Sequence, residues 1–294
     1  MPVNQRPLDV PALLRSYNLH PDKRLGQNFL VDERALDDII EAGAPESEDI
    51  VLEVGPGLGG LTRKLASRAT HVIAVELDVD LIPPLNEVIS GYSNITVIQG
   101  DILSLDIANL IETAWKKSTH GQLAKPEYLV IANIPYYMTS ILIRYLLENN
   151  LPPVRMVLTL QNEVAERICN QSGKMSLLAL SVQIYGSPQI FGRIPASSFY
   201  PVPQVDSAIL RVVRYAQPRI PAKLLPLTFR LAKAGFSQKR KILRNSISAG
   251  MHWNTDDTEL CLLDAGIDPL RRAETLSLEE WKGLAQSVND HMIP

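Results

Sequence analysis

The sequence predicts an α/β fold, a parallel sheet with helices on both faces, followed by a small all-helical domain. Short β-branched apolar runs alternate with helical stretches between Ile50 and Leu160, as expected for strands that are covered on both faces. This alternation indicates parallel strands joined by right-handed crossovers. After Ala208 one last strand is followed by apolar positions at three- and four-residue spacing, which predicts helices only.

The same patterns predict the elements in chain order. Asp32 is a suitable N-cap for a first helix, which Gly43 would close. Pro83-Pro84 is tolerated only in a first helical turn, so the helix after the second strand should begin near Asp80. We expect strands at 50–54, 72–76, 95–99, 128–132, 156–160 and 209–213. We expect helices at 33–42, 60–68, after Asp80, 107–117, 140–148, 224–234, 239–248, 257–265 and 278–288.

A domain boundary is expected near Tyr215, because Pro218 and Pro221 indicate a linker there. Residues 1–214 would form the α/β domain and residues 215–294 the helical domain.

The placement of the cysteines and histidines argues against a metal site and against disulfides. Cys169 and Cys261 lie far apart without a Cys-x-x-Cys pair, which argues against a zinc site or a disulfide framework and suits a reducing compartment. The five histidines lack metal-ligand spacing. No apolar stretch is long enough for a membrane span, and the start of the chain lacks the pattern of a secretory signal. We therefore expect a cytoplasmic protein without a metal site.

The net charge of −3 argues by itself against a nucleic-acid partner, but the distribution of charge favours one. No acidic residue occurs between Asp206 and Asp256. Ten basic residues fall in that interval: Arg211, Arg214, Arg219, Lys223, Arg230, Lys233, Lys239, Arg240, Lys241 and Arg244. A one-signed stretch of this length indicates a polyanionic partner. The alternative is that these cations pair with acids elsewhere in the chain.

A glycine-rich segment, residues 53–60, follows the first strand and opens a helix. Glycines let a turn pass close to a ligand because no side chain intervenes. Gly55, Gly57 and Gly60 fit the dinucleotide fingerprint, which makes a nicotinamide enzyme one candidate. Glu53 disfavours that candidate, because a carboxylate there would repel a pyrophosphate but attract a cationic amino group. No histidine–carboxylate pair suited to hydride transfer is evident either.

Acidic residues end three successive strands. Glu76 closes the second strand, where an acid commonly binds two ribose hydroxyls. Asp101 closes the third and could accept a hydrogen bond from an adenine amino group. Together with Glu53 they indicate an adenosine-containing cofactor across the top of the sheet. With Asn133 at the end of the fourth strand, S-adenosylmethionine fits best.

The tetrapeptide Asn133-Ile134-Pro135-Tyr136 could bind an exocyclic amino group. The Asn133 amide oxygen and the Pro135 carbonyl could each accept one amino hydrogen, and Tyr136 offers a stacking face. Taken alone, the segment is more typical of a plain turn after a strand than of a binding site. Its place after the upstream motifs favours the functional interpretation.

The chain resembles the KsgA-type small-subunit (16S) ribosomal RNA adenine dimethyltransferases. The resemblance rests on motifs in the family's order over nearly the whole chain: residues 25–30, 53–62, Glu76, 100–101, 133–136, 199–207, 236–245 and 272–277. Tyr137-Met138 replaces an Asn-Ile found in some relatives, and Pro83-Pro84 is a local peculiarity. Neither change touches the tetrapeptide.

This resemblance implies a Rossmann-like class I methyltransferase domain, residues 1–214, and a helical RNA-binding domain, residues 215–294. The implied cofactor-binding residues are Gln27, Asn28, Leu30, Glu53, Gly55, Gly57, Glu76, Leu77, Asp101, Ile102 and Asn133. The implied target-base residues are Asn133, Pro135, Tyr136 and Phe199, with Phe199 stacking on a flipped adenine. The implied RNA-binding residues are Lys239, Arg240, Lys241 and Arg244.

The implied reaction is N6-dimethylation of two adjacent adenosines in the terminal hairpin of small-subunit ribosomal RNA. The expected partner is that RNA within an assembling small subunit, bound by a monomer without membrane or metal. Two alternatives stay open: a large-subunit RNA methyltransferase of the antibiotic-resistance type, and a non-catalytic assembly or transcription factor on the same fold. The residue Phe199 also has an alternative, as an ordinary core aromatic beneath a proline turn.

Overall fold

The computed structural model describes residues 7–119, 126–171 and 173–292. The chain forms two compact units, of which the first comprises Met1–Ala165 and Gln189–Arg214. The second comprises Glu166–Pro188 and Tyr215–Pro294. The structure therefore differs from the expected continuous domain over residues 1–214.

The cause of this difference is the apolar segment around α8 (Leu177–Gln183). Leu180 and Ile184 belong to one buried cluster with Leu231 and Trp281 of the second unit. The chain thus leaves the α/β unit, contributes a helix to the other core, and returns.

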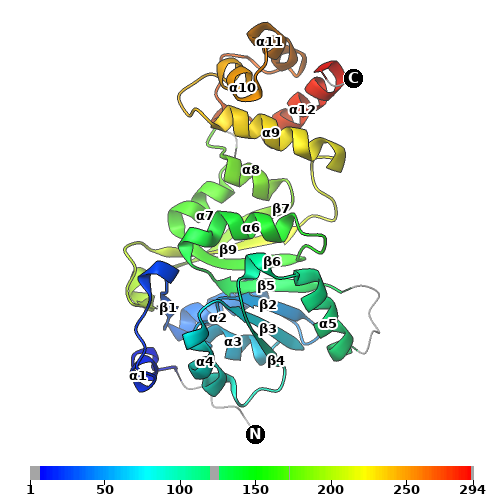
Figure 1. The fold of residues 1–294 in the computed structure, drawn as a ribbon. Helices are drawn as coiled ribbons and strands as arrows, with labels where there is room; N and C mark the ends of the chain where they lie inside the picture. The colour runs from blue at the N-terminus through cyan, green and yellow to red at the C-terminus, as the bar shows by residue number, and fades with distance from the viewer. Residues whose placement is uncertain (1–6, 120–125, 172, 293–294) are drawn as a thin grey trace. The chain divides into compact units, whose positions relative to one another are not determined.

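The first unit is built on a seven-stranded sheet with the order β4-β3-β2-β5-β6-β9-β7 (Figure 1). β2 pairs in parallel with β3 and β5, and the parallel pairing continues to β4 and β6. β9 runs antiparallel to β6, and a separate two-stranded sheet joins β1 and β8. The strands are β1 (Phe29–Leu30), β2 (Ile50–Val54), β3 (His71–Glu76), β4 (Ile95–Gln99), β5 (Tyr128–Asn133), β6 (Arg155–Gln161), β7 (Gly186–Ile194), β8 (Phe199–Tyr200) and β9 (Ser207–Arg214).

Helices cover this sheet on both faces, as the sequence predicts. Val51 and Val157 pack in one buried cluster with Leu36 of α2 and Leu65 of α3. Neighbouring strand residues point to the opposite face, and α5 and α6 lie in front of the sheet in Figure 1. The α-helices are α1 (Val10–Ser16), α2 (Glu33–Gly43), α3 (Gly60–Ala66), α4 (Ile82–Ile89), α5 (Ile107–Thr119), α6 (Thr139–Leu147), α7 (Asn162–Cys169), α8 (Leu177–Gln183), α9 (Leu225–Phe236), α10 (Leu243–Met251), α11 (Thr255–Asp264) and α12 (Leu278–Met292).

Local signals explain where several helices begin. Asp32 caps α2 by accepting hydrogen bonds from the backbone N–H groups of Arg34 and Ala35. The first turn of α4 contains the proline pair, as expected from the lost N–H donors.

Gly43 has a different role from the predicted one. It is the last residue of α2, and Ala44 takes the left-handed position with φ of 40°. A Cβ on Gly43 would clash with Cδ1 of Ile131. Gly43 is therefore required by close packing on β5, not by its backbone angle.

The second unit is helical around a fully buried Trp281. The helix expected at 239–248 starts later, at Leu243, because Ile242 is extended with ψ of 157°. Lys239, Arg240 and Lys241 lie in turns before α10. Within the residues that the structure describes, every helix is too short or too polar to traverse a bilayer.

Candidate active site

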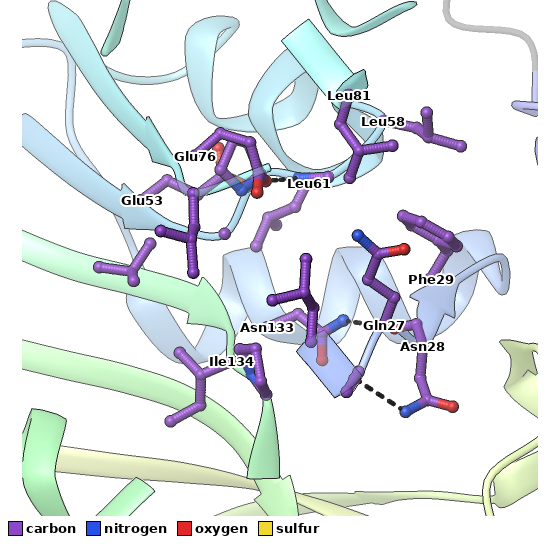
Figure 2. Close-up of a pocket in the computed structure, with 18 of the residues that line it drawn as sticks. Gln27, Asn28, Phe29, Glu53, Leu58, Leu61, Glu76, Leu81, Asn133 and Ile134 are labelled. Atoms are coloured by element: carbon purple, nitrogen blue, oxygen red, sulfur yellow. Dashed lines mark hydrogen bonds between the residues drawn. The ribbon is translucent and has the colours of Figure 1, made fainter. Parts of the chain in front are cut away.

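The candidate site is a pocket in the first unit at the carboxyl ends of the parallel strands. The chain runs outward from β2 through β3 to β4 and then crosses back to β5 on the other side of β2. Ligands of open α/β sheets bind at such a switch point. Every residue that the sequence predicted for cofactor or base binding lines this pocket. In Figure 2, Gln27, Asn28 and Phe29 lie on one side and Glu53 and Glu76 on the other.

The glycine-rich turn forms one wall. Gly55, Gly57 and Gly59 have φ of 69°, 57° and 84°, which L-residues rarely adopt. A Cβ on Gly57 would lie 3.1 Å from two carbons of the Phe29 ring. Gly60 opens α3 with an ordinary backbone, and the left-handed position just before the helix is taken by Gly59.

Glu53 is a buried acid in the pocket wall, only 1% exposed. None of the described residues donates a hydrogen bond to its Oε2. Burial raises the pKa of Glu53 to about 8; the nearby Thr62 hydroxyl opposes this rise and the Glu76 carboxylate adds to it. Thr62 Oγ1 is not within hydrogen-bonding geometry of any described residue, so it does not satisfy Glu53 Oε2. An orphaned buried oxygen of this kind fits a ligand that brings a cationic amino group.

Binding of S-adenosylhomocysteine, the product form of the expected cofactor, should therefore release a proton. At pH 7 a group with a pKa of about 8 is mostly neutral, and the ligand's ammonium group favours its ionised form. Since binding requires loss of the proton below the free-state pKa, affinity should rise with pH toward 8. Titration calorimetry in buffers of different ionisation enthalpy measures the released proton.

The control for this prediction is Glu53→Gln, which should bind without proton release and with a weaker pH dependence. Zero net proton release by the wild-type protein at pH 7 would contradict the assignment.

Glu76 is held by the backbone. Its Oε2 accepts a hydrogen bond from the N–H of Gly57 at 3.0 Å, and its Oε1 accepts from the N–H of Asp78 at 2.9 Å. Burial raises the pKa of Glu76, while these two donors oppose the rise. Asp101 is exposed and caps η3 (Ile102–Ser104) through a 2.9 Å bond from the N–H of Leu103. Both acids are thus oriented before any ligand binds.

Asn133 ends β5 with a fixed amide orientation. Its Nδ2 donates to the backbone carbonyl of Asn28 at 3.1 Å. A carbonyl oxygen can only accept, so the nitrogen must face Asn28 and Oδ1 must face away. No described residue donates to that Oδ1, which leaves it as an acceptor in the pocket.

The Pro135 carbonyl is already engaged. It accepts a hydrogen bond from the N–H of Met138 at 3.1 Å, which closes η4 (Tyr136–Met138). The target amine, which we expected this carbonyl to bind, would have to compete with the Met138 N–H for it. The carbonyl of the preceding residue, Ile134, accepts no hydrogen bond from any described backbone group.

Tyr136 is half-buried in the pocket wall, and its hydroxyl lies 2.7 Å from Oγ of the buried Ser207. Burial is the main reason why the pKa of Tyr136 is raised. Ser207 thus fixes the direction of the ring. Ser207 lies within the motif of residues 199–207, and its local sequence does not indicate this role.

Phe199 lines the pocket but is only 2% exposed. Its ring packs in the same buried cluster as Leu30 and Ile209. Little of the ring is therefore accessible to a base. This burial favours the core-aromatic alternative over the predicted full stacking contact.

Replacing Phe199 by leucine should therefore reduce methylation only modestly, about fivefold, near the lower end of 1–3 kcal/mol for base stacking. The matched control is Ile209→Val, in the same cluster but away from the pocket. Single-turnover rates and thermal melts measure the two effects. An equal loss of rate in both variants would assign Phe199 to the core alone.

The predicted RNA-binding residues divide into two groups. Lys239, Arg240 and Lys241 are exposed and form no ion pair with a described residue. Arg244 is half-buried and pairs with Glu259 at 2.6 Å. Arg244 therefore matches the pairing alternative, and the three exposed cations remain candidates for phosphate contacts.

The chain is similar to known proteins over most of its length. The sequence profile of the family described as ribosomal RNA adenine dimethylase matches residues 19–290. "Ribosomal RNA small subunit methyltransferase A" of Dehalococcoides mccartyi is 43% identical over 92% of this chain and 90% of that protein. The protein of the same name from Clostridium botulinum is 37% identical over 96% and 99%, respectively.

Two solved structures are similar over most of the chain. A dimethyladenosine transferase from Plasmodium falciparum has a TM-score of 0.73 and 25% identity, covering 89% of this chain and 98% of that one. The 23S rRNA methyltransferase ErmE has a TM-score of 0.67 and 27% identity, covering 89% and 99%. The chain belongs to the ribosomal RNA adenine dimethylase family, whose members transfer methyl groups from S-adenosylmethionine to adenines of ribosomal RNA.

Proposed function

We propose that the substrate is small-subunit ribosomal RNA within an assembling small subunit, dimethylated at N6 of two adjacent adenosines in its 3′-terminal hairpin. The similarity to the two small-subunit methyltransferases, 43% and 37% identical, supports this choice. The large-subunit enzyme ErmE is 27% identical. We further propose that the protein acts as a monomer in the cytoplasm.

The observation that carries the catalytic proposal is the fixed amide of Asn133. An adenine amine is a poor nucleophile because its lone pair is delocalised into the ring. Two acceptors that bind its hydrogens draw the lone pair out of conjugation. We assign these acceptors to Asn133 Oδ1 and, because the Pro135 carbonyl is engaged by Met138, to the carbonyl of Ile134.

S-adenosylmethionine supplies an electrophilic methyl group on its sulfonium. The chain's own contribution is position: Glu53, Glu76 and Asp101 would hold the cofactor, and Asn133 would hold the amine in line. Alignment alone can contribute roughly 7–11 kcal/mol to such a reaction. No general base is needed, because the alkylated amine is acidic enough to lose its proton. The first methyl transfer removes one amino hydrogen. During the second transfer the amine can therefore hydrogen-bond to only one of the two acceptors.

We assign the stacking face for the base to Tyr136, which is half-buried and lines the pocket. Its ring direction depends on the 2.7 Å contact with Ser207. Tyr136→Phe and Ser207→Ala should each slow methylation about fivefold, the effect of one hydrogen bond worth about 1 kcal/mol. Single-turnover kinetics at saturating cofactor measures this effect.

A double variant provides the control for the ring-positioning role. If the hydroxyl contact is the shared cause, Tyr136→Phe with Ser207→Ala should be no slower than either single change. Additive losses would show that the two residues act separately.

One assay tests the choice of substrate. The protein is incubated with labelled cofactor and undermethylated small or large subunits, and the labelled nucleotides are mapped. Label on adjacent adenosines of the small-subunit hairpin supports the proposal. Label on large-subunit RNA would establish the antibiotic-resistance type, and no label on either would favour a non-catalytic assembly factor.

A further inference from the structure

The segment of residues 22–30, here called the N-terminal strap, crosses the pocket beside Asn133. It contains η1 (Lys23–Leu25), the left-handed Gly26 with φ of 64°, and β1. Leu25 to Leu30 all line the pocket. At its far end, Leu30 pairs with Phe199.

Gln27 latches the strap to the end of β3. Its Oε1 accepts a hydrogen bond from the N–H of Asp22 at 2.7 Å, and its Nε2 donates to Asp78 Oδ2 at 2.6 Å. Both ends of the Gln27 amide are therefore used inside the protein. This makes Gln27 a structural latch and weakens its predicted role as a direct cofactor contact.

Asp78 links this latch to the cofactor wall. Its N–H donates to Glu76 at 2.9 Å, and its Oδ1 accepts from the N–H of Asp80 at 3.0 Å. The oxygen facing Gln27 is thus the one not used for the local turn.

Asn28, the residue after Gln27, fixes the orientation of the Asn133 amide. The Asn28 carbonyl accepts from Asn133 Nδ2 at 3.1 Å. Without that acceptor the amide could turn over and present its NH2 group to the amino group of the target base. Two donors would then face each other, and the base would lose one of its acceptors.

We propose that Asp78 is a positioning residue for methyl transfer: by holding Gln27 it places the Asn28 carbonyl, which in turn fixes Asn133 with its oxygen toward the base. This inference rests on the proposed role of Asn133. Asp78 itself does not line the pocket and acts through the strap.

The latch can be broken by an isosteric change. Asp78→Asn has one acceptor oxygen for two donors, so an amide that keeps the cap to Asp80 turns its NH2 group toward Gln27 Nε2, and an amide that keeps Gln27 loses the cap. Gln27 cannot escape by turning over, because its own NH2 group would then meet the N–H of Asp22. At saturating cofactor the single-turnover rate should fall about 10- to 100-fold, as expected for a misplaced reacting group.

The double variant Gln27→Glu with Asp78→Asn should restore the rate. The carboxylate introduced at position 27 would accept from the N–H of Asp22 with one oxygen and from the new amide with the other. The summed charge of the pair is unchanged. Asp80→Asn is the matched control, because no described residue is hydrogen-bonded to its side chain. Its rate should equal that of the wild type.

A readout independent of catalysis is amide hydrogen exchange of residues 26–30 with S-adenosylhomocysteine bound. Exchange should be faster in Asp78→Asn and return to the wild-type level in the double variant. If Asp78→Asn keeps the wild-type rate of methyl transfer at saturating cofactor, the proposal is overturned, even if the variant binds cofactor more weakly. The strap would then serve only to enclose the cofactor. A slow Asp78→Asn that the double variant does not rescue would also overturn it.

The proposed role of Asn133 is tested separately. Asn133→Ala with full activity would refute that role, whatever the Asp78 variants do. A slow Asn133→Ala together with a fast Asp78→Asn would refute only the latch.

Discussion

Replacing Asn133 by alanine should reduce methyl transfer by about 10²- to 10³-fold, the effect of removing one preorganised group at a reacting centre. The variant loses the amide oxygen that would accept the amino hydrogen, while Glu53, Glu76 and Asp101 remain in place. Affinity for S-adenosylhomocysteine should therefore change by only a few-fold. Single-turnover kinetics and calorimetry measure the two quantities on the same preparation.

Asn150→Ala is a suitable control for that experiment, because Asn150 is exposed in the turn after α6 and forms no hydrogen bond with a described residue. Its rate and affinity should match the wild type. Should Asn133→Ala keep full activity, or lose cofactor affinity and rate in equal measure, the amine-binding role would be wrong.

Replacing Lys239, Arg240 and Lys241 together by alanine should produce the largest loss of RNA affinity. Each phosphate contact contributes about 0.7 to 0.9 to the slope of log affinity against log salt. Three lost contacts should therefore reduce that slope by roughly 2 to 3. Binding of small-subunit precursor RNA, measured between about 50 and 200 mM salt, tests this expectation.

The matched control is a triple alanine variant of Arg34, Arg68 and Lys117, which are exposed but belong to separate segments of the first unit. Its salt slope should stay close to that of the wild type. Equal slopes in both triple variants would show that the turn before α10 is not the phosphate-binding surface. Arg244 is left out because its pairing with Glu259 would mix stability with binding.

The sequence predicted the pocket well because its signals are local. Glu76 and Asn133 end β3 and β5, Asp101 lies two residues after β4, and parallel strands bring such ends to one edge of the sheet. The fold class follows from the same strand and helix periods. These features need no knowledge of which distant segments meet.

Other features depend on distant contacts and could not be read locally. The sequence does not predict β7, because the strand contains Gly186, Pro188 and Gly192, which weaken a strand pattern. β1 and β8 have two residues each and exist only through their mutual pairing. The helix expected from Lys239 starts later, at Leu243, because the backbone of Ile242 is extended.

The details of the site also required the structure. Nothing near Phe199 in the sequence says that its ring is buried beside Leu30, and nothing near Pro135 shows that its carbonyl meets Met138. The role of Asp78 has no sequence signal, since an aspartate in a turn is ordinary.

The interrupted path of the chain has a practical consequence for dissecting the protein. Because Glu166–Pro188 belongs to the helical unit, a protein truncated after Arg214 would keep that segment but lose the residues that bury Leu180 and Ile184. The truncated protein would expose apolar surface and aggregate. To produce the first unit alone, Glu166–Pro188 must also be replaced by a short linker.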